Sequence, residues 1–393
     1  MEENKNLKVP IARTKLTQKE FDIITKPLKS GWVVQGPYVK NFENSFSKFT
    51  EAEYSVAVTS CTTALQLSLS ALGFGVGDEA IIPAFTWIST ANVIEHLGGK
   101  VVFCDINLNT FNINVDEIEE LITPRTKVII PVHLFGLSSE MDKINKIAKK
   151  HRLHVVEDAA CGFGAKYKNQ HVGTFGDMGC FSFHPRKAIT TGEGGMIITS
   201  NNDSVKLLRS MRDHGAKVSD FERHSGTKPY SLPEFPYAGY NFRMTDIQAS
   251  IGSSQMDRAD EILSERYELA QRYSDLLGKL DFFQLPYEGP DYKHGFQSYA
   301  CLFDLNSISV ESISKVNTKR NMFMERLDSL GIATRPATHA VHMLEYYREK
   351  YKISPEDYPN SFIANEASIS FPLFNGMTQD EFSYVITGIQ DSL

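Results

Sequence analysis

The chain has 393 residues, too many for one small hydrophobic core, so two domains are the default expectation. Apolar residues make up 41% of the sequence and charged residues 23%, the balance of an ordinary soluble globular protein. The formal net charge is −7, without a block of lysine or arginine, which argues against nucleic acid or an anionic membrane as the main partner.

The N-terminal segment MEENKNLKVPIARTK lacks the apolar core of a signal peptide, and no stretch approaches the apolar length of a membrane span. We therefore expect a cytoplasmic protein. The five cysteines are an odd number and include no CxxC pair. This pattern predicts reduced, mostly buried thiols, with neither a disulfide framework nor a zinc site.

The first half of the chain alternates strand-like and helix-like segments. A capping box at Thr17 and Glu20 predicts an early helix that ends near Gly31. Several strand candidates are continuous runs of Val, Ile and Phe, typical of parallel strands buried on both faces, so we expect a doubly wound α/β domain. The expected strands are 54–58, 79–82, 100–105, 127–133, 154–157, 180–183 and 196–199, and the expected helices include 62–72 and 141–151.

A long helical pattern begins near Thr245 and runs towards Leu277, and we interpret it as a bridge into a second, smaller α/β domain. We place the large domain, with the N-terminal helix, at 1–255 and the C-terminal domain at 256–393. The expected elements of the C-terminal domain are a strand at 298–304, a helix at 314–330, a loop at 331–342, a strand at 368–371 and a last helix capped by Thr378 and Glu381.

Ligands of doubly wound sheets bind beyond the carboxyl ends of the strands, and a lysine stands in such a place. Lys187 follows the aromatic strand 180–183 and precedes the glycines 192, 194 and 195. A loop lysine is usually solvated. Removing it from water favours the neutral, nucleophilic amine that Schiff-base chemistry needs.

Asp158 closes the apolar strand 154–157. Alone, it fits the N-cap of a helix after a strand. Together with Lys187 and nearby hydroxyls, it matches what pyridoxal 5′-phosphate (PLP) requires. A carboxylate that keeps the pyridine nitrogen protonated makes the ring an electron sink.

Two further features fit a PLP site and also have ordinary structural explanations. The Ser60–Thr63 turn opens a helix, so it is either a simple N-cap or a phosphate seat in which Thr62 adds a hydroxyl. Trp87 follows an expected strand and is either a core aromatic or a flat surface stacked on the cofactor ring.

Six stretches, in this order, resemble the DegT/DnrJ/EryC1/StrS aminotransferases, PLP enzymes that mostly aminate nucleotide-linked keto-sugars. The resemblance covers nearly the whole chain. It implies the PLP-dependent transferase fold type I, with a mainly parallel central sheet in the large domain and a smaller C-terminal α/β domain. The stretches are SGWVVQGPYVKNFE (30–43), TSCTTALQLSLSALG (59–73), GDEAIIPAFTWISTANVI (77–94), VEDAACGFGA (156–165), GDMGCFSFHPRKAITTGEGGM (176–196) and GYNFRMTDIQASIG (239–252).

The resemblance implies a role for each candidate residue. Lys187 is expected to form the internal aldimine, Asp158 to hold the pyridine nitrogen and Trp87 to stack on the ring. Asn241 is expected to reach the phosphate of the neighbouring subunit's cofactor, which implies a homodimer with shared active sites. The implied phosphate ligands of the same subunit are Ser182, Thr62 and the backbone at Cys61.

Two positions depart from the commonest family pattern. Cys61 stands where the family often has glycine in an SGT-type turn, which puts the backbone contact to the phosphate in doubt. Cys161 stands where the family often has glutamine or histidine facing the ring oxygen of the cofactor, so this contact is also in doubt. Neither departure affects the lysine and the carboxylate on which the chemistry depends.

By resemblance, the amino donor is L-glutamate and the acceptor a keto-sugar, in a ping-pong reaction in which Lys187 moves the proton. The favoured acceptor is a nucleotide diphosphate-linked 4-keto-6-deoxysugar. A smaller phosphorylated ketone would use the same machinery. Arg335 and His339, in the 331–342 loop, are candidate acceptor contacts, although a surface loop with a structural arginine explains them equally well.

Two other functions are alternatives to transamination. A dehydratase of the same family carries histidine where Lys187 stands, and some need an iron–sulfur cluster on closely spaced cysteines, which Cys161 and Cys180 are not. A non-catalytic regulatory or scaffold protein should have lost Lys187 or Asp158, and neither a helix-turn-helix nor a basic patch accompanies them. The sequence therefore favours a PLP-dependent aminotransferase without a metal site.

Overall fold

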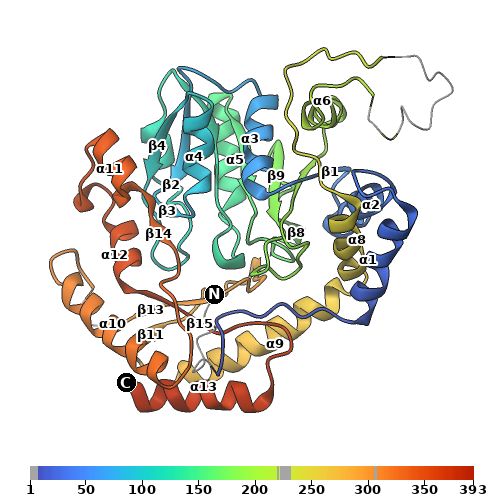
Figure 1. The fold of residues 1–393 in the computed structure, drawn as a ribbon. Coiled ribbons are helices and arrows are strands. Elements are labelled where there is room, and N and C mark those ends of the chain that lie inside the picture. Colours follow the sequence, from blue (N-terminus) through green and yellow to red (C-terminus); the bar gives the residue numbers. More distant parts are fainter. Residues whose placement is uncertain (1–7, 219–220, 222–231, 305–307) are drawn as a thin grey trace.

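A computed structural model describes residues 8–218, 221, 232–304 and 308–393 (Figure 1). Residues 1–7 of the N-terminal segment considered above lie outside these ranges. In the described chain, the central element is a seven-stranded sheet with the strand order β1-β10-β9-β6-β5-β2-β4. Its strands are β1 (Tyr54–Val58), β2 (Glu79–Pro83), β4 (Lys100–Cys104), β5 (Thr126–Ile129), β6 (His154–Asp158), β9 (Met178–Ser182) and β10 (Gly195–Thr199).

Within this sheet, β10 alone among the described strands runs against the others. It pairs antiparallel with β1 and with β9, whereas β9, β6, β5, β2 and β4 pair in parallel. The carboxyl ends of β1, β6 and β9 therefore lie at the same edge of the sheet. Ser60, Asp158 and Ser182 stand at this edge, where a doubly wound sheet binds its ligands.

Helices cover both faces of the sheet, because successive strand residues point to opposite sides. Val56 packs in the core under α3, α4 and α6, and its neighbour Ala57 packs in the core under α2 and α8. The prediction that these strands are buried on both faces is confirmed. These helices, with α5 on the α2 side, are α2 (Pro37–Thr50), α3 (Cys61–Ala71), α4 (Ser89–His96), α5 (Met141–His151), α6 (Asn202–Arg212) and α8 (Asp246–Met256).

A second, three-stranded sheet, β11-β13-β15, lies in the C-terminal part of the chain. Figure 1 shows α9 leading from α8 towards α10 and α13 at the bottom of the view. The core of this part is aromatic: the rings of Tyr273 and Tyr299 stack with centroids 4.9 Å apart. The elements are α9 (Ala259–Leu277), β11 (Phe283–Gln284), β13 (Tyr299–Phe303), α10 (Ile313–Ser329), β15 (Ser368–Phe371) and α13 (Gln379–Ser392).

Shorter elements connect these layers. Among them, β14 pairs with β3 and joins the C-terminal part to the large sheet, and β12 extends the β7–β8 hairpin. The remaining elements are α1 (Gln18–Ser30), β3 (Phe85–Thr86), η1 (Ile118–Leu121), η2 (Leu134–Gly136), β7 (Lys166–Tyr167), β8 (Gln170–His171), β12 (Tyr292–Lys293), β14 (His339–Ala340), η4 (Val341–Met343), α11 (Glu345–Tyr351), η5 (Pro355–Asp357) and α12 (Pro359–Ala367).

Most elements expected from the sequence are present, with ends that differ by a few residues at most. Both capping boxes form, with Thr17 and Glu20 starting α1 and Thr378 and Glu381 starting α13. Gly31 ends α1 with a φ of 76°, a left-handed conformation that glycine adopts without strain. All five cysteines are free thiols and all but Cys161 are buried, which agrees with the prediction.

The expected continuous helix from Thr245 to Leu277 is wrong. The helix is interrupted at Asp257 and Arg258, which separate α8 from α9. Arg258 leaves the helical conformation, with φ −122° and ψ 16°, and its buried guanidinium pairs with Glu20 of α1 at 3.2 Å. The boundary placed between residues 255 and 256 stays a prediction. In the described parts of the chain, none of the helices combines the length and apolar character that a membrane span requires.

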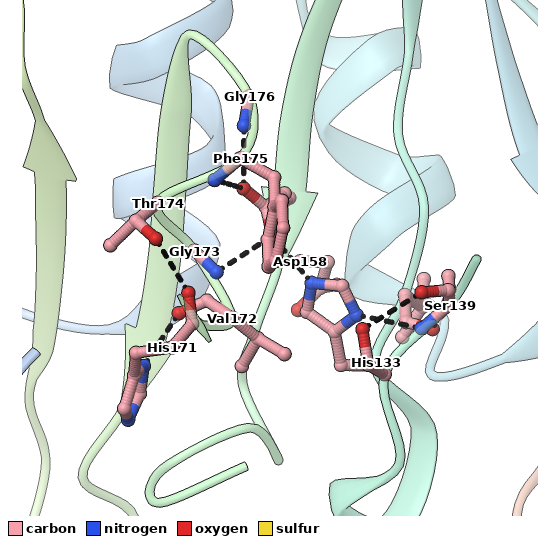
Figure 2. A network of polar contacts seen from close by, with 12 residues as sticks. His133, Ser139, Asp158, His171, Val172, Gly173, Thr174, Phe175 and Gly176 are labelled. Carbon is pink, nitrogen blue, oxygen red and sulfur yellow. Dashed lines mark hydrogen bonds and ion pairs between the residues drawn. The ribbon is translucent and has the colours of Figure 1, made fainter. Parts of the chain in front are cut away.

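A buried polar network fixes the end of β6 (Figure 2). The Glu157 carboxylate is fully buried and accepts hydrogen bonds from the backbone N–H groups of Gly173, Phe175 and Gly176 at 2.6–2.7 Å. It also accepts one from Nε2 of His133 at 2.8 Å. The Nδ1 atom of this ring accepts from the Ser139 N–H at 3.1 Å, so the ring hydrogen lies on Nε2. The network thus joins the 173–176 segment to the residue that precedes Asp158.

We predict that Glu157→Gln destabilises the protein by about 1–3 kcal/mol, because at least one buried donor is left without an acceptor. Either orientation of the amide places its NH₂ group against backbone donors: Phe175 and Gly176 on one side, Gly173 on the other. Urea unfolding measures the free energy.

The matched control for this substitution is Glu261→Gln, since the Glu261 side chain is 65% exposed and lies 3.9 Å from its partner Arg258. This change is expected to leave the free energy of unfolding nearly unchanged, as for other exposed pairs. Equal midpoints and slopes for wild type and Glu157→Gln would contradict the role assigned to the network.

Candidate active site

Two adjacent strand ends bring a lysine, a thiol and a carboxylate together. Lys187 lies beyond β9, in a turn where its N–H donates to the carbonyl of His184 at 2.8 Å. Its Nζ atom lies 3.1 Å from Sγ of Cys161, in the turn after β6. Asp158 is the last residue of β6, beside Cys180 of β9 in the parallel pair. The sequence-predicted centre of the site is therefore assembled from neighbouring strands.

The Asp158 side chain is buried and held by two donors. The Thr90 hydroxyl donates to Oδ2 at 2.7 Å, and the Ala160 N–H donates to Oδ1 at 3.1 Å. The Cys61 thiol lies 3.9 Å from Oδ1. Burial raises the pKa of the Asp158 carboxyl, while the two hydrogen bonds and the charge of Lys187 act in the opposite direction. A buried carboxylate of this kind is stabilised by a positive charge placed next to it.

The N-terminus of α3 lies at the same edge. Ser60 is its N-cap, and its hydroxyl accepts from the Thr63 N–H at 3.1 Å. The N–H groups of Cys61 and Thr62, in the first turn, have no acceptor within the helix, so this end suits an anion. The backbone of β10 can lie against the Ser60–Cys61 peptide only because residue 195 is glycine. A Cβ there would lie 2.4 Å from the Ser60 carbonyl carbon and 2.7 Å from the Cys61 nitrogen.

Hydroxyl groups surround this helix end. Thr62 donates its hydroxyl hydrogen to Ser89 Oγ at 3.0 Å. Ser182, at the end of β9, is partly exposed, and its Oγ accepts from the His184 N–H at 3.4 Å. Nothing in the sequence marks Ser89 and Thr90 as site residues, because they resemble ordinary residues at the start of a helix.

Trp87 follows β3 and is 52% exposed, so the alternative of a core aromatic is wrong. Its ring lies 5.6 Å from that of His339, which is also exposed. The expected loop 331–342 is in fact partly strand: β14 pairs with β3, with His339 opposite Thr86, and the Thr338 hydroxyl donates to the Thr86 carbonyl at 3.1 Å. The segment becomes a strand because the residues beyond 337 form hydrogen bonds with the backbone groups of β3.

Asn241 and Arg335 stand apart from the contacts that join the other candidates in the described chain. Asn241 is exposed and its backbone bridges to Asp213. Arg335 is exposed, and its backbone pairs with Ser370 of β15.

Known proteins resemble this chain over nearly its whole length. The model of the DegT/DnrJ/EryC1/StrS aminotransferase family matches residues 14–390. The chain belongs to this family. SpsC of Bacillus subtilis, a spore coat polysaccharide biosynthesis protein, is 34% identical over 391 residues, covering 100% of this chain and 98% of SpsC. The uncharacterized protein MJ1066 of Methanocaldococcus jannaschii is 37% identical over 384 residues, 97% of each chain.

Solved structures agree with the family assignment. The candidate sugar aminotransferase Spr1654 of Streptococcus pneumoniae, in its form with pyridoxamine phosphate, superposes with a TM-score of 0.89 at 28% identity over 98% of both chains. The same protein has been solved with PLP. The DegT/DnrJ/EryC1/StrS protein described here is therefore a PLP-dependent aminotransferase of fold type I, from a family that acts on sugars.

The residues present fit PLP. The buried Asp158 carboxylate can pair with a protonated pyridine nitrogen, and Lys187 supplies an amine at the same edge of the sheet. The N–H groups at the start of α3 suit the phosphate, and Gly195 places no Cβ in this space. The exposed Trp87 ring offers a surface for the pyridine ring.

We predict that Gly195→Ala weakens PLP binding about tenfold or more. The new Cβ has to displace the Ser60–Cys61 peptide, and such overpacking costs about 1–3 kcal/mol. Fluorescence or absorbance titration of the apoprotein with PLP measures the dissociation constant.

Gly192→Ala is the control, because its Cβ would meet no atom within 4 Å although its φ is +82°. Its unfavourable conformation destabilises the turn without entering the space at the start of α3. If both variants bind PLP equally well, Gly195 does not shape the phosphate seat.

Proposed function

We infer that this protein moves an amino group from L-glutamate to a nucleotide diphosphate-linked 4-keto-6-deoxysugar. The observation that carries the proposal is the placement of the Lys187 amine and the buried Asp158 carboxylate at adjacent strand ends, close enough for the charge of Lys187 to act on the pKa of Asp158. The assignment of each site residue is likewise part of the proposal. Family membership supports sugar as the substrate class, and PseC of Helicobacter pylori, 25% identical with a TM-score of 0.88, is an aminotransferase in the biosynthesis of pseudoaminic acid.

PLP, when bound, supplies the electron sink that stabilises negative charge at the carbon from which a proton is removed. The chain's own residues perform the remaining tasks. Asp158 keeps the pyridine nitrogen charged, and Thr90 and Ala160 hold this carboxylate in place. Lys187 would hold the cofactor through its amine. When that amine is free, Lys187 would take the proton from the α-carbon of the donor and give it to the aldehyde carbon of the cofactor.

The surroundings of Lys187 support anionic substrates. A pocket beside this lysine is lined by five cationic side chains and a single carboxylate, that of Glu265, which also pairs with Lys15. Three of the five cations are paired with carboxylates: Arg13 with Glu381, Lys15 with Glu265 and Arg258 with Glu20. Both carboxylates of glutamate and the diphosphate of the acceptor are negative, and the remaining positive charge of this lining favours them. The cations are Arg13, Lys15, Lys187, Arg258 and Arg266.

The acceptor is expected to lie between Trp87 and the β14 segment. The pairing of β14 with β3 holds the exposed imidazole of His339 beside the Trp87 ring, which favours His339 as an acceptor contact. Arg335 lies farther back along this segment and pairs with β15 through its backbone, so its role as an acceptor contact depends on its exposed side chain.

A homodimer with shared sites is also part of the proposal. Apolar side chains are exposed along α1 and the residues after it, including Phe21, Leu28 and Val34. This surface adjoins the segment that carries Asn241, because the Asp246 N–H donates to the Val34 carbonyl at 3.1 Å. Apolar surface of this kind supports a subunit interface, and it would bring Asn241 to the partner's phosphate seat.

We predict that the PLP-loaded protein is yellow and that L-glutamate bleaches this absorbance. Lys187→Ala should lower the rate of amino transfer by roughly 10²–10⁴-fold, because the proton carrier is lost. Lys206→Ala, which alters a lysine that is 67% exposed on α6, is the control and should bleach like wild type. A Lys187→Ala variant that transfers at the wild-type rate would overturn the assignment.

The same preparation tests the acceptor. After L-glutamate is removed, the nucleotide-linked 4-keto-6-deoxysugar should restore the yellow absorbance and be recovered as the amino sugar by mass spectrometry. Restoration by a small phosphorylated ketone, with none by the nucleotide-linked sugar, would contradict the proposed acceptor.

We predict that mixing two inactive variants, Lys187→Ala and Asn241→Ala, restores activity at limiting PLP. In a mixed dimer, one of the two sites receives wild-type Lys187 and wild-type Asn241. Since half of the dimers are mixed, recovery should reach about a quarter of the wild-type rate. Exchange of subunits without any recovery would contradict the sharing of sites.

A further inference from the structure

Cys161 differs from the other cysteines of this chain. It is partly exposed, whereas Cys61, Cys104, Cys180 and Cys301 are buried. Burial raises the pKa of these four thiols above the ordinary value. Since thiol oxidation requires exposure and thiolate character, these four are protected. Cys161 is therefore the cysteine that a small oxidant in the active site can reach.

This cysteine also has a reactive neighbour held in place by the fold. Its sulfur lies 3.1 Å from Nζ of Lys187, an amine that comes from a different strand end. Cys161 lies within a tight turn, in which the Ala160 N–H donates to Asp158 and the Gly162 N–H donates to the Ala159 carbonyl at 2.8 Å. The Lys187 amine thus lies beside the one cysteine thiol that is not buried.

We propose that Cys161 is an oxidative modification site whose sulfur, once oxidised by a hydroperoxide, forms a reversible S–N bond with Lys187. The reaction requires a Lys187 amine that is not bonded to the cofactor and that lies beside the Cys161 sulfur, and the two atoms are 3.1 Å apart. The charged groups nearby are Asp158, before the Cys161 turn, and the cations and carboxylate that line the pocket beside Lys187: Arg13, Lys15, Arg258, Arg266 and Glu265.

The chemistry takes two steps. A hydroperoxide transfers one oxygen atom to the thiolate, which is oxidised by two electrons to the sulfenic acid, and an alcohol or water leaves. The neutral Lys187 amine then attacks this sulfur: an S–N bond forms, the S–O bond breaks, and hydroxide leaves with the amine proton as water. A thiol reverses the link by attacking the sulfur and releasing the amine. A second thiol frees Cys161 and becomes part of a disulfide.

The functional consequence rests on the proposed role of Lys187. An amine bonded to Cys161 can neither bind PLP nor move a proton, so oxidation inactivates the enzyme. When PLP occupies the amine, the link cannot form, and the cofactor protects the site. The enzyme is expected to be most sensitive after L-glutamate has freed Lys187 and before an acceptor arrives.

The experiment treats three forms of the wild-type protein with hydrogen peroxide: apoprotein, PLP-loaded, and PLP-loaded with L-glutamate. After digestion, mass spectrometry should find the peptides of Cys161 and Lys187 joined, with the mass of both less two hydrogen atoms. The joined product should be several-fold more abundant in the apoprotein and with L-glutamate than in the PLP-loaded form. Dithiothreitol should release it.

Two variants complete the test. Cys161→Ser should abolish the product, and Lys187→Arg should yield a Cys161 sulfenic acid that dimedone traps. Wild-type apoprotein in which peroxide leaves Cys161 unlinked, or oxidises the four buried cysteines first, would overturn the proposal. A link that forms equally well with and without PLP supports the S–N bond and contradicts Lys187 as the residue that bonds to PLP, so the two ideas fail separately.

Discussion

The rest of this structure depends on the end of β6, where two buried carboxylates follow one another. Side chains of a strand alternate between faces, so Glu157 and Asp158 serve different surroundings. Glu157 accepts hydrogen bonds from three backbone N–H groups and from the His133 ring, which ties the 173–176 segment and the chain after β5 to the strand. Asp158 follows this anchored residue, and its carboxylate accepts from Thr90, from Ala160 and from the more distant Cys61 thiol. Its carboxylate therefore faces the site in a set position.

Elements whose signals lie in their own residues could be predicted from the sequence. The capping boxes of α1 and α13 and the apolar runs of the central sheet are of this kind. Elements whose ends depend on contacts with residues far away in the chain could not be predicted in this way. The helix α2 begins with Gly36 and Val39 N–H groups that donate to Asp246, more than 200 residues away. The break before α9 places Arg258 against Glu20, which a helical pattern does not reveal.

The same distinction holds for the site. The placement of Lys187, Asp158 and Trp87 was predictable because each stands at or after the end of a strand, and parallel strands end at one edge. Thr90 and Gly195 were not assigned roles, because their importance lies in a contact made across the fold: a hydroxyl on a buried carboxylate and a missing Cβ against the Ser60–Cys61 peptide. The role of Asn241 follows from neither the sequence pattern nor the fold of one chain, since its implied partner belongs to another subunit.

The arrangement separates the chemical step from the choice of substrate. Lys187, Asp158 and the start of α3 all lie at one edge of the large sheet, whose buried hydrogen bonds leave little freedom. His339 is brought to Trp87 by the short β14–β3 pairing, from a segment that otherwise packs with the small sheet. A change in this segment would reshape the proposed acceptor end without disturbing the lysine or its carboxylate. Such a division would let one framework serve different acceptors, because specificity would reside in contacts that the core does not constrain.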